Sequence, residues 1–242
     1  MIRRFVVSLV GLGAVLASVV AAEPVHAANP PVLVVAGFTE TTNQLSTLVS
    51  NLQNAGFTAV GMQLPSTNGI PGCGDIAASS QAVATRAQQL LSQTGASQLD
   101  VVGHSEGGLE LRYYIKNLGG AAQVARYVSL ATPQHGTGLA SLGFTFGCQA
   151  VSQMAPNSSF LNTLNSPTDV PGAVVYTALA TTKDTVVTPA PQASFLRNGG
   201  TNATVQQFCP NDNSSHVGLL TDAPTFGLVR TALLGQPLST TC

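Results

Sequence analysis

The chain has 242 residues, which suits a single domain, and its nine Lys and Arg against ten Asp and Glu give a net charge of −1. This balance gives no electrostatic reason to bind nucleic acid or an anionic membrane surface. Charged residues are only 8% of the chain, whereas disordered chains are typically charge-rich. We therefore expect a folded domain, acting as a monomer, with no nucleic-acid partner.

The N-terminus has the pattern of an export signal. Residues 1–4 carry two positive charges, and residues 5–22 form an uncharged, largely apolar run. Val25-His26-Ala27 then offers small residues at the positions that a signal peptidase reads. We predict a signal peptide over 1–27, a single domain over 28–242, and a secreted protein without a membrane anchor. A retained anchor is the alternative, which the absence of a following stop-transfer cluster disfavours.

From residue 30 onward, apolar runs typical of strands alternate with stretches of helical spacing. Strands are expected at 32–36, 58–62, 98–103, 124–131, 173–180 and 205–208, and helices at 45–54, 75–94, 109–118 and within 217–234. Two segments look irregular: the Pro- and Gly-rich residues 65–74, and residues 133–165. Such alternation predicts an α/β fold, a mostly parallel central sheet with helices on both faces.

Four cysteines follow the expected cleavage site: Cys73, Cys148, Cys209 and Cys242. An even number in an exported chain indicates disulfides, and the lack of a Cys-x-x-Cys pair argues against a zinc site. Of the three possible pairings, Cys73–Cys148 with Cys209–Cys242 is favoured. It joins two mid-chain loops and fastens the C-terminus.

Residues 103–107 read Gly-His-Ser-Glu-Gly, which matches Gly-x-Ser-x-Gly. The motif lies between a predicted strand and a predicted helix, as a nucleophile elbow requires, and this context makes the signal specific. Glycines are needed there because the serine backbone is strained and its neighbours pack closely. The plainer alternative is a glycine-rich turn with an incidental serine. The context favours Ser105 as a nucleophile.

A serine hydroxyl needs a general base, and the chain after residue 27 contains three histidines: His104, His135 and His216. His104 lies inside the elbow and is expected to face away from the Ser105 side chain. In this fold the chain order is serine, acid, histidine, which selects His216 as the base. His135 is the second candidate for that role, and a loop-packing residue is the simpler interpretation of it.

Six acidic residues follow Ser105: Glu106, Glu110, Asp169, Asp184, Asp212 and Asp222. The acid must orient the imidazole and stabilise its charged form. Asp184 follows the predicted strand 173–180, at the carboxyl edge where open α/β sheets bind ligands, and it is favoured. Asp169 precedes that strand and is placed at the opposite edge. Asp212 is the alternative, in a turn-forming run where its carboxylate has a local role available.

Several segments together resemble the small secreted bacterial triacylglycerol lipases of class 2, in the α/β-hydrolase superfamily. They are Val101-Val102-Gly103-His104-Ser105-Glu106-Gly107-Gly108, then Tyr113-Tyr114-Ile115-Lys116-Asn117-Leu118, Lys183-Asp184, and His216-Val217-Gly218-Leu219-Leu220. The resemblance implies a compact fold with no large lid, and a Ser105–Asp184–His216 triad. It also implies cleavage of carboxylic esters such as acylglycerols, with no metal or cofactor.

The same resemblance implies an oxyanion hole built from the backbone N–H groups of Phe38 and Glu106. Two residues depart from the family pattern. The His-Gly pair after the first strand reads Ala36-Gly37 here, and an acidic Glu106 replaces an uncharged side chain. A carboxylate beside the oxyanion opposes negative charge unless it points away or is paired.

An acyl pocket is expected from apolar residues that follow the strands: Leu64, Leu139, Leu142, Phe144, Phe146, Val186, Val187 and Leu219. Three other functions are compatible with the same sequence. A polyester or wax-ester hydrolase shares the triad, and an acyltransferase differs only in excluding water. A secreted binding protein on an inactive hydrolase scaffold is the non-enzymatic alternative, which the complete set of Ser, Asp and His disfavours.

Overall fold

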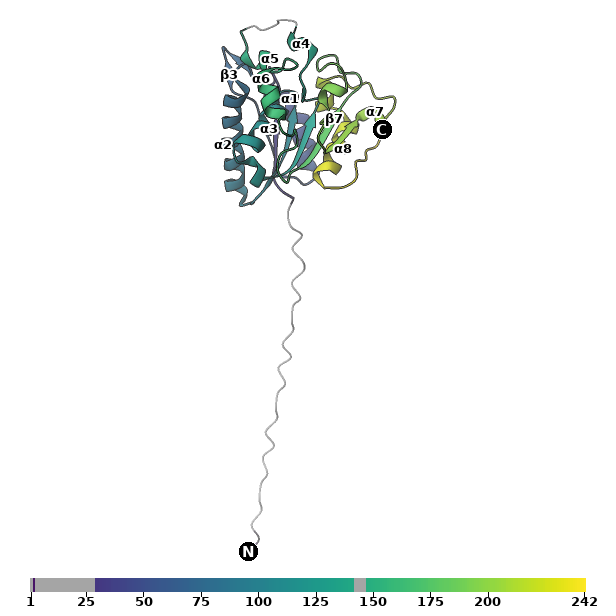
Figure 1. The fold of residues 1–242 in the computed structure, drawn as a ribbon. Coiled ribbons are helices and arrows are strands. Elements are labelled where there is room, and N and C mark those ends of the chain that lie inside the picture. The colour runs from purple at the N-terminus through teal and green to yellow at the C-terminus, as the bar shows by residue number, and fades with distance from the viewer. Residues whose placement is uncertain (1, 3–28, 142–146) are drawn as a thin grey trace.

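The computed structural model describes residue 2, residues 29–141 and residues 147–242. Its centre is a six-stranded sheet of order β2-β1-β5-β6-β7-β8 in which every neighbouring pair is parallel (Figure 1). The strands are β1 (Val32–Val35), β2 (Ala59–Met62), β5 (Leu99–His104), β6 (Val124–Leu130), β7 (Val175–Ala180) and β8 (Thr201–Thr204). The predicted parallel α/β architecture is confirmed.

Helices cover both faces of this sheet. On one face, α1 (Thr42–Asn54) and α8 (Ala223–Leu233) pack on Val32, Val34 and Val102. On the other face, α2 (Ile76–Thr94) and α3 (Gly107–Asn117) pack on alternate residues of the same strands, including Leu33 and Val35. Successive strand residues point to opposite faces, so a continuous apolar run is what a sheet covered on both sides requires.

The remaining elements are short. They are β3 (Ser66–Thr67), β4 (Ile70–Pro71), α4 (Gly138–Ser141), α5 (Gln149–Gln153), α6 (Ser159–Asn165), α7 (Val205–Phe208), and the 3₁₀ turns η1 (Gly120–Ala122), η2 (Gln192–Ser194) and η3 (Val217–Leu220). In Figure 1, α4, α5 and α6 lie toward the end of the molecule opposite the entry of β1, which is the carboxyl end of the parallel strands. Within the residues that the structure describes, the segments predicted as irregular, 65–74 and 133–165, therefore contain a small hairpin and three short helices.

One predicted strand is wrong. Residues 205–208 form α7, and the sixth strand of the sheet is the preceding, polar β8. The backbone N–H of Thr204 donates to Gln207 Oε1 at 2.9 Å, which caps the start of this helix. A four-residue run with apolar ends has no period that separates strand from helix, whereas its local cap favours helix.

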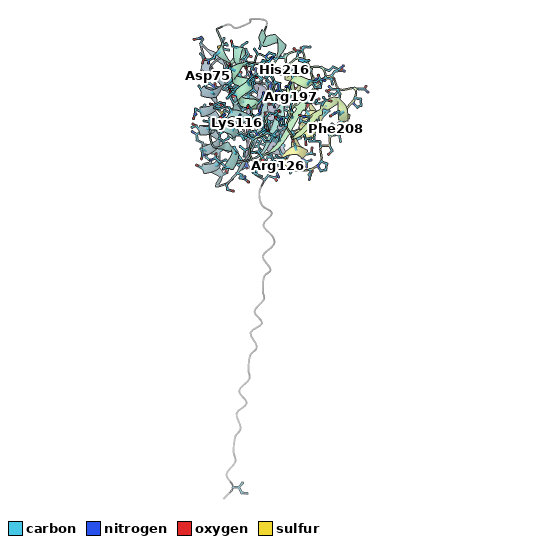
Figure 2. All side chains as sticks on the ribbon, viewed as in Figure 1. Asp75, Lys116, Arg126, Arg197, Phe208 and His216 are labelled. Atoms are coloured by element: carbon cyan, nitrogen blue, oxygen red, sulfur yellow. A yellow bond between two sulfur atoms is a disulfide. The ribbon has the colours of Figure 1, made fainter. Side chains whose placement is uncertain are left out.

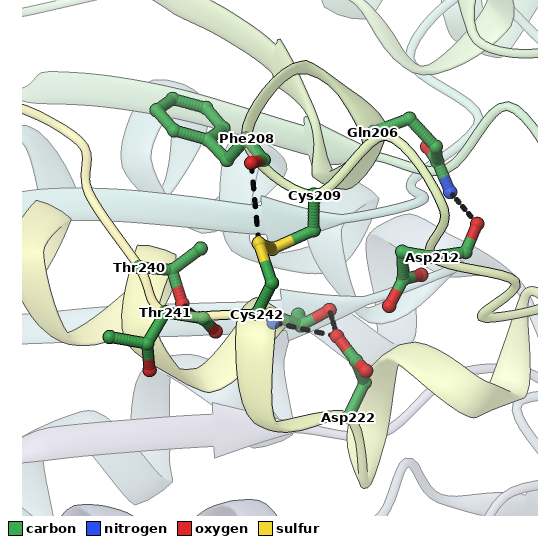
Figure 3. Close-up of a disulfide and its surroundings, with 9 residues drawn as sticks. Gln206, Phe208, Cys209, Asp212, Asp222, Thr240, Thr241 and Cys242 are labelled. Atoms are coloured by element: carbon green, nitrogen blue, oxygen red, sulfur yellow. Dashed lines mark hydrogen bonds between the residues drawn. A yellow bond between two sulfur atoms is a disulfide. The ribbon is translucent and has the colours of Figure 1, made fainter.

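Both favoured disulfides are present. Cys73–Cys148 joins the segment before α2 to the start of α5, and Cys209–Cys242 fastens the C-terminal residue beside α7 (Figure 3). Across the part of the chain that the structure describes, no helix combines the length and hydrophobicity needed to cross a bilayer.

Candidate active site

Ser105 lies in the turn that leaves β5 and enters α3, with a positive φ of 52°. This conformation is strained for a residue with a side chain. A Cβ on Gly103 would lie 2.6 Å from the backbone of Gly108, and one on Gly107 would lie 2.4 Å from the carbonyl oxygen of Ala36. Both motif glycines are therefore required sterically, and the strand–turn–helix context matches a nucleophile elbow.

The loop after β1 packs directly against this turn. A Cβ on Gly37 would lie 2.7 Å from the Cβ of Ser105. Among the described residues, the backbone N–H groups of Phe38 and Glu106 donate to no acceptor. Two free backbone donors thus flank Ser105, one from each segment. Free donors of this kind can stabilise a developing oxyanion.

His216 is buried at the start of η3, and its Nδ1 lies 2.8 Å from Oδ2 of Asp184. Because a carboxylate oxygen accepts, Nδ1 carries the proton, and Nε2 of the neutral ring keeps a lone pair. His216 lies at the end of the molecule opposite Arg126, a residue near the start of β6 (Figure 2). This is the end at which the parallel strands finish, as expected for a ligand site.

The Asp184 carboxylate is fully engaged. Its Oδ1 accepts the backbone N–H groups of Val186 and Val187, each at 2.8 Å. Burial favours the neutral acid and raises its pKa, but the hydrogen bond and electrostatic attraction of His216, together with the two N–H donors, outweigh burial, so the pKa is lowered overall. The alternative acid, Asp212, instead accepts the backbone N–H of Ser214 at 2.8 Å in a local turn.

His104 and Glu40 form a second buried histidine–carboxylate pair beside the first. His104 Nδ1 lies 2.9 and 2.8 Å from the two carboxylate oxygens of Glu40, and Nε2 lies 3.0 Å from the carbonyl oxygen of His216. The two imidazole rings have centroids 4.8 Å apart. Glu40 also accepts the backbone N–H of Gly37 at 2.7 Å. No sequence motif points to Glu40 or predicts a role for His104.

Glu106 and Glu110 are both fully buried, one turn apart at the start of α3. Among the described residues, no group donates to any of their four carboxylate oxygens. Burial raises the pKa of Glu106 well above its usual range, and the neighbouring carboxyl groups add to this. Burial likewise raises the pKa of Glu110 to about 8. A protonated member of the pair can donate to the other, so the Glu106 side chain need not place a charge at the oxyanion.

His135, the second candidate base, belongs to a separate network. Its Nε2 lies 3.1 Å from Oδ2 of Asp169 and its Nδ1 lies 3.2 Å from the Asn165 amide nitrogen. Asp169 also accepts the backbone N–H groups of Arg197 and Asn198. Burial opposes ionisation of Asp169, but these donors hold its pKa at about 2. With both ring nitrogens engaged, His135 ties loops together.

The residues proposed for the acyl pocket are distributed unevenly. Leu64 belongs to the core under α2, and Leu219 to the core under α8, both with almost no exposed surface. Val187 is buried, whereas its neighbour Val186 is 38% exposed. Leu139 lies on α4. Leu142, Phe144 and Phe146 lie outside the described residues.

The model of the palmitoyl protein thioesterase family matches residues 31–183 of the chain. The chain belongs to this family. The matched segment runs from β1 through the elbow to the end of β7, and it stops one residue before Asp184. The match supports the prediction that the chain is a hydrolase. It does not confirm the narrower resemblance to small secreted class 2 lipases.

Several solved structures share the fold. Lipase B of Aspergillus fumigatus is 20% identical with a TM-score of 0.75, covering 88% of this chain and 54% of that one. The mature lipase BlEst2 of Bacillus licheniformis is 18% identical with a TM-score of 0.68, covering 89% and 95%. XC6422 of Xanthomonas campestris, an α/β serine hydrolase without a lid, is 19% identical with a TM-score of 0.52, covering 87% and 86%. The chain thus has the α/β-hydrolase fold and spans about half the length of the Aspergillus lipase.

Proposed function

We propose that this protein is a secreted serine hydrolase that cleaves carboxylic esters, with acylglycerols as its substrates, as a lipase or esterase does. Ser105 is the nucleophile, His216 the general base and Asp184 the acid that orients it. The observation that carries the proposal is the placement of the Asp184–His216 pair. The carbonyl of His216 is hydrogen bonded to His104, the residue directly before the strained Ser105.

The reaction follows from these positions. His216 Nε2 takes the proton of the Ser105 hydroxyl as Oγ attacks the ester carbonyl carbon. The backbone N–H groups of Phe38 and Glu106 stabilise the oxyanion that forms; losing one such donor typically costs about 3–4 kcal/mol. The intermediate then expels the alcohol, which takes its proton from His216, and leaves an acyl-enzyme. Water attacks the acyl carbonyl, gives a proton to His216, and releases the acid as Ser105 regains its proton.

The family match favours a second substrate class, acyl thioesters. Attack on a thioester uses the same serine, base and oxyanion donors, and it releases a thiol in place of an alcohol. The same catalytic residues therefore serve both classes, and the part of the site that contacts the leaving group decides between them.

Labelling with a fluorophosphonate probe tests the nucleophile. The purified protein should bind one equivalent of probe at Ser105, and the Ser105→Ala variant should bind none. Hydrolysis of p-nitrophenyl esters of increasing chain length, compared with acyl thioesters of the same chains, then tests the substrate class. A folded protein that neither takes up the probe nor hydrolyses either series would refute the proposed function and favour a binding protein.

The proposal includes export, with cleavage of the signal peptide after Ala27 and a single domain over 28–242. Support comes from the two disulfides, which persist in oxidising compartments. N-terminal sequencing of the exported protein should begin at Ala28. A protein retained in the membrane with its first residues intact would contradict this assignment.

A further inference from the structure

Three segments meet at the buried ring of His104: the elbow, the loop after β1 and the start of η3. His104 immediately precedes Ser105, and its ring has no exposed surface. Its Nε2 reaches the carbonyl of His216, a residue 112 positions away in sequence. Its Nδ1 reaches Glu40, whose carboxylate also accepts the N–H of Gly37. Gly37 in turn precedes Phe38, one of the two oxyanion donors.

The hydrogen-bond partners fix where the protons lie. The carbonyl of His216 can only accept, so Nε2 of His104 carries a proton. Nδ1 faces a carboxylate at hydrogen-bond distance, and two acceptors do not approach this closely without a proton between them. The Glu40–His104 pair therefore holds one shared proton. The pair is a bridge with no free position for exchange with substrate.

We propose that His104, held by Glu40, is a positioning residue that sets the place of His216 relative to Ser105. Asp184 fixes the rotation of the His216 ring through Nδ1, and His104 fixes the backbone that carries this ring. The contact between the two imidazole rings supports the same arrangement. Because Glu40 also binds Gly37, one carboxylate ties the oxyanion loop, the nucleophile and the base together.

This inference rests on the proposed function, because positioning is meaningful only if His216 acts on Ser105. Its expected signature is a loss in kcat with little change in KM. A shift of about 1 Å in a catalytic group can cost roughly 100-fold in rate. Substrate binding, in contrast, does not depend on the His216 backbone bond.

Two variants of His104 separate its two hydrogen bonds. The amide nitrogen of glutamine can reach the place of Nε2, so His104→Gln can still donate to the His216 carbonyl. The amide of asparagine reaches only the place of Nδ1, so His104→Asn keeps a bond to Glu40 and loses the bond to His216. We expect kcat of His104→Asn to fall about 100-fold with KM within threefold, and His104→Gln to keep at least ten times the kcat of His104→Asn.

A matched pair at Glu40 covers the case in which His104→Asn does not fold. Glu40→Gln can accept from Gly37 and donate to His104 Nδ1, so the network survives without its shared proton. Glu40→Ala removes both bonds. We expect Glu40→Gln to retain at least ten times the kcat of Glu40→Ala at similar melting temperatures.

The measurements are kcat and KM on a p-nitrophenyl ester, thermal melting and fluorophosphonate uptake for all five proteins. Equal kcat within threefold for the two members of each folded pair would overturn the inference, as would losses confined to KM or losses that follow melting temperature. In those cases a reactive wild type leaves the proposed function standing. A wild type that neither takes up the probe nor hydrolyses the ester refutes both.

Discussion

The Glu106–Glu110 pair gives the sharpest prediction about stability. Both side chains are fully buried, and burial raises the pKa of Glu110 from about 4.5 to about 8 and holds that of Glu106 well above its usual range. The folded protein therefore holds protons here that the unfolded chain releases near pH 4.5. The extra stability is fully present below pH 4.5 and is lost as pH rises toward about 8.

The magnitude follows from the number of retained protons. Each proton held by the folded state alone lowers the free energy of unfolding by about 1.4 kcal/mol per pH unit. Between pH 5 and pH 7 this amounts to about 2.7 kcal/mol for each retained proton, or roughly 5–11 °C in melting temperature for a domain of this size. The double variant Glu106→Gln, Glu110→Gln keeps the shape, lets one amide donate to the other, and removes both titrations.

Thermal and guanidinium unfolding from pH 5 to pH 9, with disulfides intact, measures the difference in free energy of unfolding between wild type and double variant. Groups common to both proteins cancel in this difference. Asp100→Asn is a matched control, because burial raises the pKa of Asp100 only to about 6 despite the nearby Arg126. The difference in unfolding free energy between Asp100→Asn and wild type should stop changing above pH 7. The difference for the double variant should keep changing up to about pH 8. A constant difference for the pair between pH 5 and pH 8 would refute the reasoning.

The same pair bears on catalysis at alkaline pH. The position that a Cβ of Gly72 would occupy is 2.6 Å from Glu106 Oε2 and 3.2 Å from the Cα of Phe38, so the carboxyl group lies beside the oxyanion loop. Ionisation of Glu110 above about pH 8 places negative charge on this buried pair, one turn from the oxyanion donor of Glu106, and should lower kcat in the wild type. The double variant keeps the backbone donor of residue 106 and should not show this decline.

Three further predictions concern the triad and the disulfides. Ser105→Ala should lose about 10⁶-fold in kcat while the melting temperature is kept, by analogy with loss of a triad serine in subtilisin, and activity within tenfold of wild type would contradict the nucleophile assignment. Asp184→Asn should lose about 10⁴-fold because the imidazole can adopt the wrong tautomer, whereas Asp212→Asn should stay within threefold; reversed effects in the same ester assay would reassign the acid. Thiol titration of denatured, unreduced protein should find no free thiol, since loops of 75 and 33 residues are each worth about 4 kcal/mol on the chain-entropy estimate. Two or more thiols per chain would exclude the paired cysteines.

The elements predicted correctly from sequence are those whose period is long enough to read. The run 32–35 is buried on both faces, so its apolar residues are continuous, whereas the equally buried 99–104 includes the polar Asp100 and His104. Helix α2 repeats its apolar face over 19 residues. The helices within 133–165 have four to seven residues, too few for a period, and depend on tertiary contacts such as the Cys73–Cys148 disulfide.

Asp184 is chosen as the acid on the topology of the sheet and not on a local sequence motif. Asp184 and His216 have no local signal that joins them, but the rule that parallel strands end at one edge predicts their proximity. The structure gives a hydrogen bond of 2.8 Å between them. The turn-forming run around Asp212 likewise predicted a local hydrogen bond, which the Ser214 N–H makes. For Asp184 and Asp212, the sheet-edge rule and the turn pattern predict the hydrogen bonds that the structure has.

No rule of this kind predicts that the carboxylates around the elbow are buried, but the composition gives one indication of it. The chain has only ten acidic residues, and six of them are buried: Glu40, Asp100, Glu106, Glu110, Asp169 and Asp184. Buried acids are rare unless they are paired or neutral. Four of these six face a histidine or an arginine. The other two face each other, so most acids of this sparsely charged chain lie in the interior, where a proton, an imidazole or a guanidinium must accompany them.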